Sequence, residues 1–154
     1  MTTRERLNEA VGEWSGTNRL WLMPDDPARE SRIEASIELV AGGAFASIRY
    51  TWEDEGRAHD GLLVVRNAPE PGPEDIFWVD SFHTAGGSMT FRGEADPDGR
   101  IVAVGSYAAP PGPDWGWRIA LKTDADEGLR IVMHNITPDG QEALAVEAEL
   151  TRSA

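Results

Sequence analysis

Turn-forming residues divide this chain into short segments of similar length. Clusters rich in Pro, Gly and Asp recur nine times, at residues 24–27, 41–43, 54–56, 69–73, 85–87, 96–99, 110–113, 124–128 and 138–140. These residues favour reversals of the backbone, because Gly adopts positive φ, Pro fixes φ, and Asp side chains hydrogen-bond to the following backbone. Nine such turns bound ten segments, a division typical of all-β proteins.

The ten segments have the composition and periodicity of β-strands. In the second one, Ile33, Ala35 and Ile37 alternate with polar residues, which is the period of a strand with one buried face. The segments cover residues 12–22, 31–40, 44–53, 57–66, 75–84, 88–95, 100–108, 114–122, 129–137 and 141–152.

One short stretch before these segments favours a helix. In residues 3–11, Thr3 can cap the helix, and Leu7 and Val11 lie one turn apart. A short N-terminal helix followed by ten consecutive strands predicts an all-β fold, a ten-stranded up-and-down antiparallel barrel. Closure of the barrel leaves no strand edge exposed.

Composition narrows the class of protein and its partners. With 154 residues and 40% hydrophobic content, the chain suits one domain over residues 1–154. Its 27 acidic residues outnumber 14 basic ones, and the net charge of −13 argues against nucleic acid and anionic membranes as partners. The absence of cysteine excludes disulfides and thiolate chemistry. The first 14 residues lack an apolar signal segment, and no apolar run reaches the length of a membrane span, so we expect a cytoplasmic protein.

Gly12 and Trp14 form a Gly-x-Trp pattern at the start of the first predicted strand. This pattern resembles the signature of the calycin superfamily, the lipocalins and fatty-acid-binding proteins, where the Trp plugs the closed end and stacks under an Arg of the last strand. The resemblance implies that Arg152 stacks on Trp14, a contact that an indole face and a guanidinium favour. We expect this pair to be structural, with Arg152 tying the carbonyls of the short helix to the barrel floor.

Further stretches extend the resemblance over nearly the whole chain. WSG near the start, WVDSFHT at 78–84, WGWR at 115–118 and MHNITPDGQE at 133–142 resemble a bacterial lipocalin-like family of unknown function. The resemblance implies the barrel and no established activity. Nitrobindin, a haem-binding ten-stranded barrel, is a distant relative, and the place of its iron-ligating histidine falls on Ala145. We therefore expect no haem, and we expect His83 and His134 to be structural rather than iron ligands.

Reflection about the turn centres gives an approximate register. The predicted pairs are Trp117–Asn135, Arg118–His134, Tyr107–Trp115 and Gly105–Trp117, and His59 is placed close to His83. Gly105 opposite Trp117 is interpreted as a size match between a missing side chain and a large indole. The apolar residues leave the inner face open, because odd positions are apolar in residues 115–133 and even positions in residues 144–150. A bulge or a one-residue shift is expected between these strands.

Aromatic and hydrogen-bonding residues gather on the third, fifth, eighth and ninth strands. We predict a ligand pocket there, in the open half of the barrel. Its candidate walls are Trp52, Trp78, Tyr107, Trp115 and Trp117, and its candidate polar groups are His83, Arg118, His134 and Asn135.

For several of these residues the sequence leaves two interpretations open. Arg118 either clamps a ligand carboxylate or pairs with acidic residues outside the barrel. Asp80 and His83 lie three residues apart, which on a straight strand puts them on opposite faces. We therefore expect Asp80 to tie the following turn rather than to form an acid–base pair with His83. The tryptophans either line a cavity or fill it.

Three functions are compatible with these features. The first is a carrier or sensor that binds a small apolar or aromatic molecule, anionic if Arg118 contacts it. The second is an enzyme built on the same cavity, an isomerase, cyclase or hydrolase, with His83, His134 or Tyr107 as proton carriers. The third is a filled barrel that acts as a structural or homodimeric interaction module. The sequence contains no Walker, His-Glu-x-x-His or Gly-x-Ser-x-Gly motif, and we predict no metal site and no cofactor.

Overall fold

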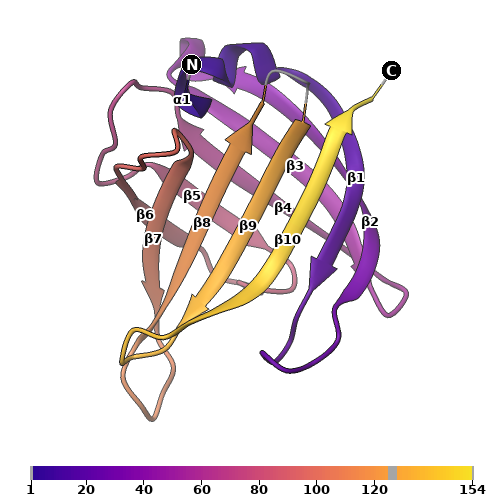
Figure 1. Cartoon of the computed structure of the whole chain (residues 1–154), viewed down its shortest axis with the longest axis vertical. Helices are drawn as coiled ribbons and strands as arrows, with labels where there is room; N and C mark the ends of the chain where they lie inside the picture. Colours follow the sequence, from indigo (N-terminus) through magenta and orange to yellow (C-terminus); the bar gives the residue numbers. More distant parts are fainter. Residues whose placement is uncertain (1, 125–127, 154) are drawn as a thin grey trace.

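The computed structural model describes residues 2–124 and 128–153, which form ten strands closed into one antiparallel barrel (Figure 1). Each strand pairs with the next along the chain, and the last pairs with the first. The strands are β1 (Gly12–Leu20), β2 (Arg29–Val40), β3 (Phe45–Asp54), β4 (Arg57–Arg66), β5 (Ile76–Asp80), β6 (Met89–Glu94), β7 (Ile101–Tyr107), β8 (Trp115–Thr123), β9 (Gly128–Ile136) and β10 (Glu142–Arg152). The predicted ten-stranded up-and-down barrel is confirmed. Within the predicted turn at 124–128, residues 125–127 lie outside the described residues.

Of the ten strands, β5 falls furthest short of its predicted length. β5 ends at Asp80, four residues before the expected end at Thr84. Asp80 Oδ1 accepts hydrogen bonds from the backbone N–H groups of Phe82 and His83, both at 2.8 Å. The N–H groups of Thr84 and Ala85 donate to the Asp80 carbonyl at 3.1 and 3.0 Å. An Asp that binds the following N–H groups favours a turn over a strand. The expected tie between Asp80 and the next turn is confirmed, and it removes the following residues from the sheet.

A short helical segment covers one end of the barrel, at the top of Figure 1. The predicted helix is α-helical only in α1 (Thr3–Arg6) and continues as a 3-10 turn, η1 (Leu7–Ala10). The predicted cap Thr3 is wrong by one residue. Thr2 Oγ1 accepts from the Glu5 N–H while the Glu5 carboxylate accepts from the Thr2 N–H, a capping box. No helix in the described ranges is long and apolar enough to cross a membrane.

Trp14 and Arg152 hold the helical segment against the barrel. They are cross-strand partners on β1 and β10, and the guanidinium lies 4.6 Å from the indole centroid. Trp14 Nε1 donates to the Ala10 carbonyl at 2.9 Å. Arg152 donates to the carbonyls of Val11 at 2.8 Å and Glu9 at 2.6 Å. The stacked pair and its ties to the helix carbonyls have the expected geometry, and we call this end of the barrel the closed end.

A buried ion pair gives the closed end a second anchor. Asp75 is fully buried just before β5, and its Oδ2 accepts from Arg4 Nη2 at 2.5 Å. Its Oδ1 accepts from Arg66 Nε at 3.0 Å and from the Gly72 N–H at 3.1 Å. A Cβ at Gly93 would lie 1.7 Å from Asp75 Oδ2, so only glycine leaves room for the carboxylate. Both oxygens are bound, which offsets the cost of burying the charge.

The register of β7, β8 and β9 agrees with the turn-centre prediction. The confirmed pairs are Trp117–Asn135, Arg118–His134, Tyr107–Trp115 and Gly105–Trp117. The nearest side chain to Gly105 is Phe91, because a Cβ at this position would lie 3.0 Å from Phe91 Cδ2.

The conflict between odd and even apolar positions has two causes. The register pairs even residues of β10 with odd residues of β9, such as Val146 with Met133, so both parities face the interior. In addition, a register shift between Leu144 and Val146 places a bulge in β10, as expected. On the mouth side of this bulge, Leu144 pairs with His134, and His134 lies on the opposite face of β9 from Met133.

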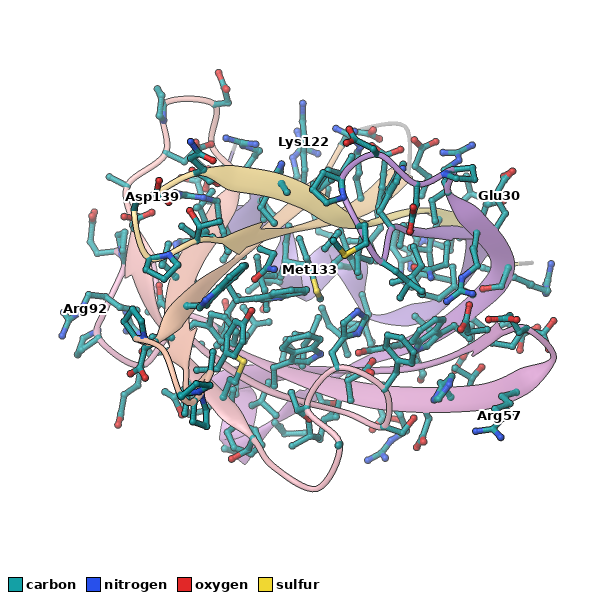
Figure 2. The ribbon with its side chains drawn as sticks, turned by 90° about the horizontal axis from the view of Figure 1, so that it is seen from below. Glu30, Arg57, Arg92, Lys122, Met133 and Asp139 are labelled. Carbon is teal, nitrogen blue, oxygen red and sulfur yellow. The ribbon has the colours of Figure 1, made fainter. Side chains whose placement is uncertain are left out.

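Side chains fill the interior of the barrel. Figure 2 views the molecule from the end opposite the helix, with Met133 inside and Glu30, Arg57, Arg92, Lys122 and Asp139 around the outside. Buried residues from all ten strands form one core cluster. The cavity left inside measures about 20 Å³, room for about one water molecule. The end opposite the helix, formed by loops 21–28, 81–88, 108–114 and 137–141, is called the mouth.

Candidate functional site

Two pockets open at the mouth on either side of a shared wall. The first, of about 440 Å³, lies between residues 20–24 and the mouth ends of β8, β9 and β10. The second, of about 350 Å³, lies between residues 83–89 and the end of β7. His83 and Trp117 line both pockets, and His83 also lines the small interior cavity. Because small-molecule sites measure roughly 300 Å³ or more, the mouth rather than the interior has room for a ligand.

The walls of the first pocket are mainly apolar. Residues 21–24 form one side, and Trp115 and Trp117 form another. Within the loop, the adjacent residues Leu22 and Met23 are 49% and 62% exposed. A contiguous exposed apolar patch beside a pocket is typical of a binding surface. The polar groups of this pocket include His83 and Asn135.

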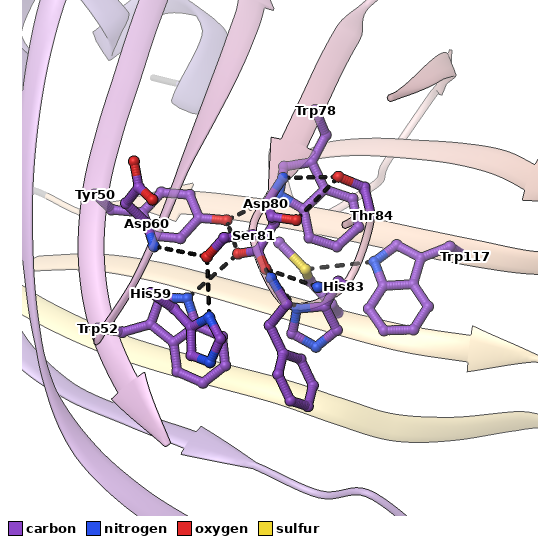
Figure 3. Close-up of polar contacts among 12 residues, drawn as sticks. Tyr50, Trp52, His59, Asp60, Trp78, Asp80, Ser81, His83, Thr84 and Trp117 are labelled. Carbon is purple, nitrogen blue, oxygen red and sulfur yellow. Dashed lines mark hydrogen bonds and ion pairs between the residues drawn. The ribbon is translucent and has the colours of Figure 1, made fainter. Parts of the chain in front are cut away.

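A buried carboxylate lies behind His83 (Figure 3). Asp80 Oδ2 accepts hydrogen bonds from Tyr50 Oη at 2.5 Å and Trp52 Nε1 at 3.3 Å. Asp80 Oδ1 lies 3.3 Å from His83 Nδ1. Tyr50 Oη in turn accepts from Trp78 Nε1 at 2.9 Å. The expectation that Asp80 and His83 do not pair is wrong, because β5 ends at Asp80 and the chain turns His83 back toward it.

The network fixes the protonation states of Asp80 and Tyr50. Burial raises the pKa of Asp80, but the hydrogen bond and positive charge of His83 and the hydrogen bond from Tyr50 outweigh it, leaving a pKa of about 2. Burial, followed by the charge of Asp80, raises the pKa of Tyr50 well above its ordinary value of 10. At neutral pH Asp80 is therefore an anion and Tyr50 a neutral donor.

Gly61 makes the position of Tyr50 possible. The two residues are cross-strand partners on β3 and β4. A Cβ on Gly61 would lie 2.2 Å from Tyr50 Oη and 2.8 Å from the Val79 carbonyl oxygen. Any larger residue would displace the hydroxyl that binds Asp80.

The imidazole of His83 lies among indoles. Its centroid is 5.8 Å from Trp52 at an interplanar angle of 24°, 5.5 Å from Trp78 and 5.4 Å from Trp117. Trp78 stacks on Trp117 at 5.6 Å and 20°. The His83 side chain is 13% exposed. These contacts and the bond to Asp80 hold the imidazole in one orientation on the pocket wall.

Hydrogen bonds also order the opposite side of the mouth. Tyr107 Oη donates to Asn135 Oδ1 at 2.6 Å, and burial raises the pKa of Tyr107. Trp117 Nε1 donates to Met133 Sδ at 3.4 Å. Within the described ranges no acceptor is bound to the Asn135 amide NH2, so this group is left as a donor for the first pocket.

Two predicted site residues point away from the mouth pockets. Arg118 donates to Glu94 at 2.8 Å and to both oxygens of Glu142 at 2.9 and 3.0 Å. Of its two expected roles, the structure shows the pairing with acids outside the barrel, because Arg118 lies on the face opposite to Trp117. His134, its cross-strand partner, shares that face, and burial chiefly lowers the pKa of His134.

The other seven predicted residues lie at or just beneath the mouth. Trp78, His83, Tyr107, Trp115, Trp117 and Asn135 line its pockets, and Trp52 lines the small cavity below. Sequence reasoning missed Tyr50 and the loop at 21–24. Tyr50 shares a strand face with Trp52 two residues later, which was a usable signal. The loop gave none, because Trp21 and Leu22 belong to the predicted first strand.

The histidines do not form a metal centre within the described part of the chain. No group of three or more His, Asp or Glu residues is suitably placed there. His59 Nδ1 bonds to Ser81 Oγ at 2.9 Å, and its ring lies 5.3 Å from Phe82, which also contacts His83 at 4.9 Å. Ala145, the place aligned with an iron ligand, lines the first mouth pocket and supplies no ligating side-chain atom.

Comparisons with known proteins give a family and a fold. The family model described as a protein of unknown function (DUF1579) matches residues 1–152. Among solved structures, the crystal structure of Rv2717c from M. tuberculosis is similar, with a TM-score of 0.65 and 16% identity over 97% of this chain and 96% of that one. At that identity the likeness shows the fold alone. No match was found among curated proteins.

Proposed function

We propose that the protein binds a small, largely apolar aromatic molecule at the mouth. The chain belongs to the DUF1579 family, whose description names no activity, so the proposal is based on the mouth alone. The resemblance to lipocalins and fatty-acid-binding proteins supports a carrier or sensor of this kind, acting in the cytoplasm.

The observation that carries the proposal is the shared wall of His83 and Trp117. Two pockets of about 440 and 350 Å³ flank this wall, and the first is bordered by Trp115 and the apolar loop at 21–24. An aromatic ring gains both removal of apolar area from water and offset stacking in such a place.

The polar groups favour a neutral ligand over an anion. Arg118, the side chain that would select a carboxylate, is engaged by Glu94 and Glu142 on the outer face. The mouth instead offers the imidazole of His83, which accepts, and the amide of Asn135, which donates. A phenol or a nitrogen heterocycle satisfies such a pair better than a fatty acid.

The filled-barrel module is the competing proposal. The interior cavity of about 20 Å³ favours it, because no ligand larger than water fits there. The mouth pockets argue against it, since a purely structural barrel has no need of an exposed apolar loop beside them.

The test uses 2-naphthol and 2-naphthoate as ligands, followed by the six indole N–H signals in a heteronuclear NMR spectrum. We expect 2-naphthol to bind with a dissociation constant on the order of 10–100 μM and to shift the signals of Trp115 and Trp117. Trp14 at the closed end is an internal control, and its signal should stay in place. 2-Naphthoate should bind more weakly.

Substitution then assigns the site. Trp117→Leu should weaken 2-naphthol binding by about tenfold or more, as loss of a stacked aromatic does, whereas His134→Gln on the outer face should leave it unchanged. If 2-naphthol moves no indole signal at high micromolar concentration, or moves Trp14 as much as Trp117, the mouth is not a ligand site.

A further inference from the structure

We infer that the mouth is a proton-transfer site in which Nε2 of His83 is a general base, so that the protein removes a proton from a weakly acidic C–H or O–H group of a bound aromatic molecule. This inference rests on the proposed binding function and adds a reaction to it. Of the three proton carriers expected from the sequence, the structure singles out His83.

The contact with Asp80 determines the tautomer of His83. Asp80 is an anion with no proton to donate, so the hydrogen in the contact between its Oδ1 and His83 Nδ1 belongs to the imidazole. A neutral imidazole with a proton on Nδ1 carries its lone pair on Nε2. Ring geometry directs Nε2 away from Asp80, as Figure 3 shows for the ring.

Nε2 of His83 is available to a bound molecule. Within the described residues no donor is bound to it, since the polar contacts of His83 are its backbone N–H and Nδ1, both to Asp80. The ring lines both mouth pockets. A molecule held against Trp117 therefore meets an unused proton acceptor.

Both charges that the proton transfer creates have a partner at the mouth. When Nε2 takes a proton the imidazolium stays paired with Asp80, whose other oxygen is held by Tyr50 and Trp52. The anion formed on the substrate meets the amide NH2 of Asn135 in the first pocket. A buried carboxylate that orients a histidine, and a donor for the developing anion, are the parts that general-base catalysis requires.

The other titratable groups near the mouth are poorer bases. Tyr50 and Tyr107 have raised pKa values and remain protonated donors. His59 faces His83 across Phe82 and Trp52 but is bound through Nδ1 to Ser81, and no carboxylate of the described residues is bonded to its ring. His134 lies on the outer face beside Arg118.

The test reaction is the ring opening of 5-nitrobenzisoxazole, which needs only a base in an apolar pocket. The base takes the proton from C3, the C–H electron pair forms the nitrile bond, and the N–O bond breaks to leave a coloured phenolate. No oxidant, reductant or cofactor takes part. We expect a rate above that of free imidazole at the same concentration.

Variants assign the base. His83→Gln should lower the rate by about 100-fold, within the range of general-base effects, and Asp80→Asn by a smaller factor because the imidazole loses its orientation. His134→Gln and His59→Gln should retain the rate of the unsubstituted protein. The Trp14 indole signal reports whether each variant is folded, and the ¹⁵N shifts of His83 in the unsubstituted protein report the tautomer independently of any variant.

The outcomes separate the two proposals. If 2-naphthol binds at the mouth but the rate does not depend on His83, or Nε2 carries the proton at neutral pH, the inference is overturned while the binding function stands. If neither 2-naphthol nor the substrate binds, both fall. A rate lost in His83→Gln, with 2-naphthol binding retained, supports the inference.

Discussion

The closed end and the mouth of the barrel use the same kinds of side chain for different purposes. At the closed end, the Trp14 indole is covered by Arg152, and the fully buried Asp75 is bound by Arg4 and Arg66. At the mouth, an indole and an aspartate recur with a histidine in place of the arginines. Trp117 lines both mouth pockets, and Nε2 of His83 has no partner among the described residues.

The two ends differ in the basic side chain that binds the aspartate, which is arginine at the closed end and histidine at the mouth. Arginine keeps its charge at all relevant pH values and donates from a fixed fork, so it locks two segments together permanently. Histidine changes charge near neutral pH and has two distinct nitrogens, so it can be held by one and react through the other. We therefore expect substitutions at the closed end to act mainly on stability, and substitutions at the mouth mainly on binding and chemistry.

The largest expected contrast is between two tryptophans. Trp14→Ala should lower the free energy of unfolding by about 3–5 kcal/mol, as truncation of a fully buried aromatic does. Trp115→Ala, at the half-buried mouth position, should cost less than about 1 kcal/mol. Urea unfolding of both variants measures the difference. Equal losses would contradict the division of roles between the two ends.

The next contrast uses the closed-end ion pair. Asp75→Asn removes the anion that Arg4 and Arg66 share, and should cost about 3 kcal/mol because a buried cation is left unpaired. Glu34→Gln, which breaks the exposed pair with Arg32, serves as the control and should change stability by less than about 0.5 kcal/mol. A loss for Asp75→Asn no larger than that for the control would show that Asp75 does not anchor the closed end.

A smaller effect is expected in the acid stability of the mouth. The pKa of Asp80 is lowered to about 2 in the folded protein, below its value of about 3.9 in the unfolded chain. The charged form therefore stabilises the fold above pH 4, by about 2 kcal/mol, and this contribution disappears as the pH falls through 2. Urea unfolding of the natural protein and Asp80→Asn between pH 6 and pH 2 measures it. Parallel pH profiles would show that Asp80 is not stabilised as an anion.

The smallest effect is spectroscopic. Both tyrosines of the chain have raised pKa values, Tyr50 through burial and then the charge of Asp80, and Tyr107 through burial. Stability contributed by neutral Tyr50 is present below pH 10 and is lost as the pH rises through its folded pKa. Ultraviolet absorbance should therefore show that tyrosinate forms only above pH 10 in the folded protein, whereas it forms near pH 10 in the protein unfolded by urea. Coincident titrations would contradict the burial of both hydroxyls.

The fold was predictable from local signals, because turn residues determined the number of strands and hairpin symmetry determined the register around Trp117. At the closed end, the resemblance carried by Gly12 and Trp14 pointed to Arg152, whereas the ion pair of Asp75 with Arg4 gave no sequence signal. The centre of the mouth was not predictable in the same way. Asp80 pairs with His83 only because β5 ends early, and a strand period applied through residue 84 puts the two on opposite faces.

The contacts at the mouth between residues far apart in the sequence could be identified only from the structure. Tyr50 meets Asp80 from 30 positions away, and no spacing rule predicts such a contact. The outward position of Arg118 and His134 did follow from alternation with Trp117 and Asn135, once the inner parity was known. That parity changes across the bulge in β10, which the sequence indicated without locating it.

Closure between β1 and β10 also determines the order in which the molecule is assembled. The bond from Arg152 to Val11 spans 141 positions, so the strand that carries Trp14 leaves the ribosome long before its partner exists. Until β10 arrives, β1 has one unpaired edge, and pairings of such long range slow folding. The closed end, expected to contribute most to stability, is therefore completed last, and a chain stalled before residue 152 would lack its strongest lock while the aromatic residues of the mouth were already made.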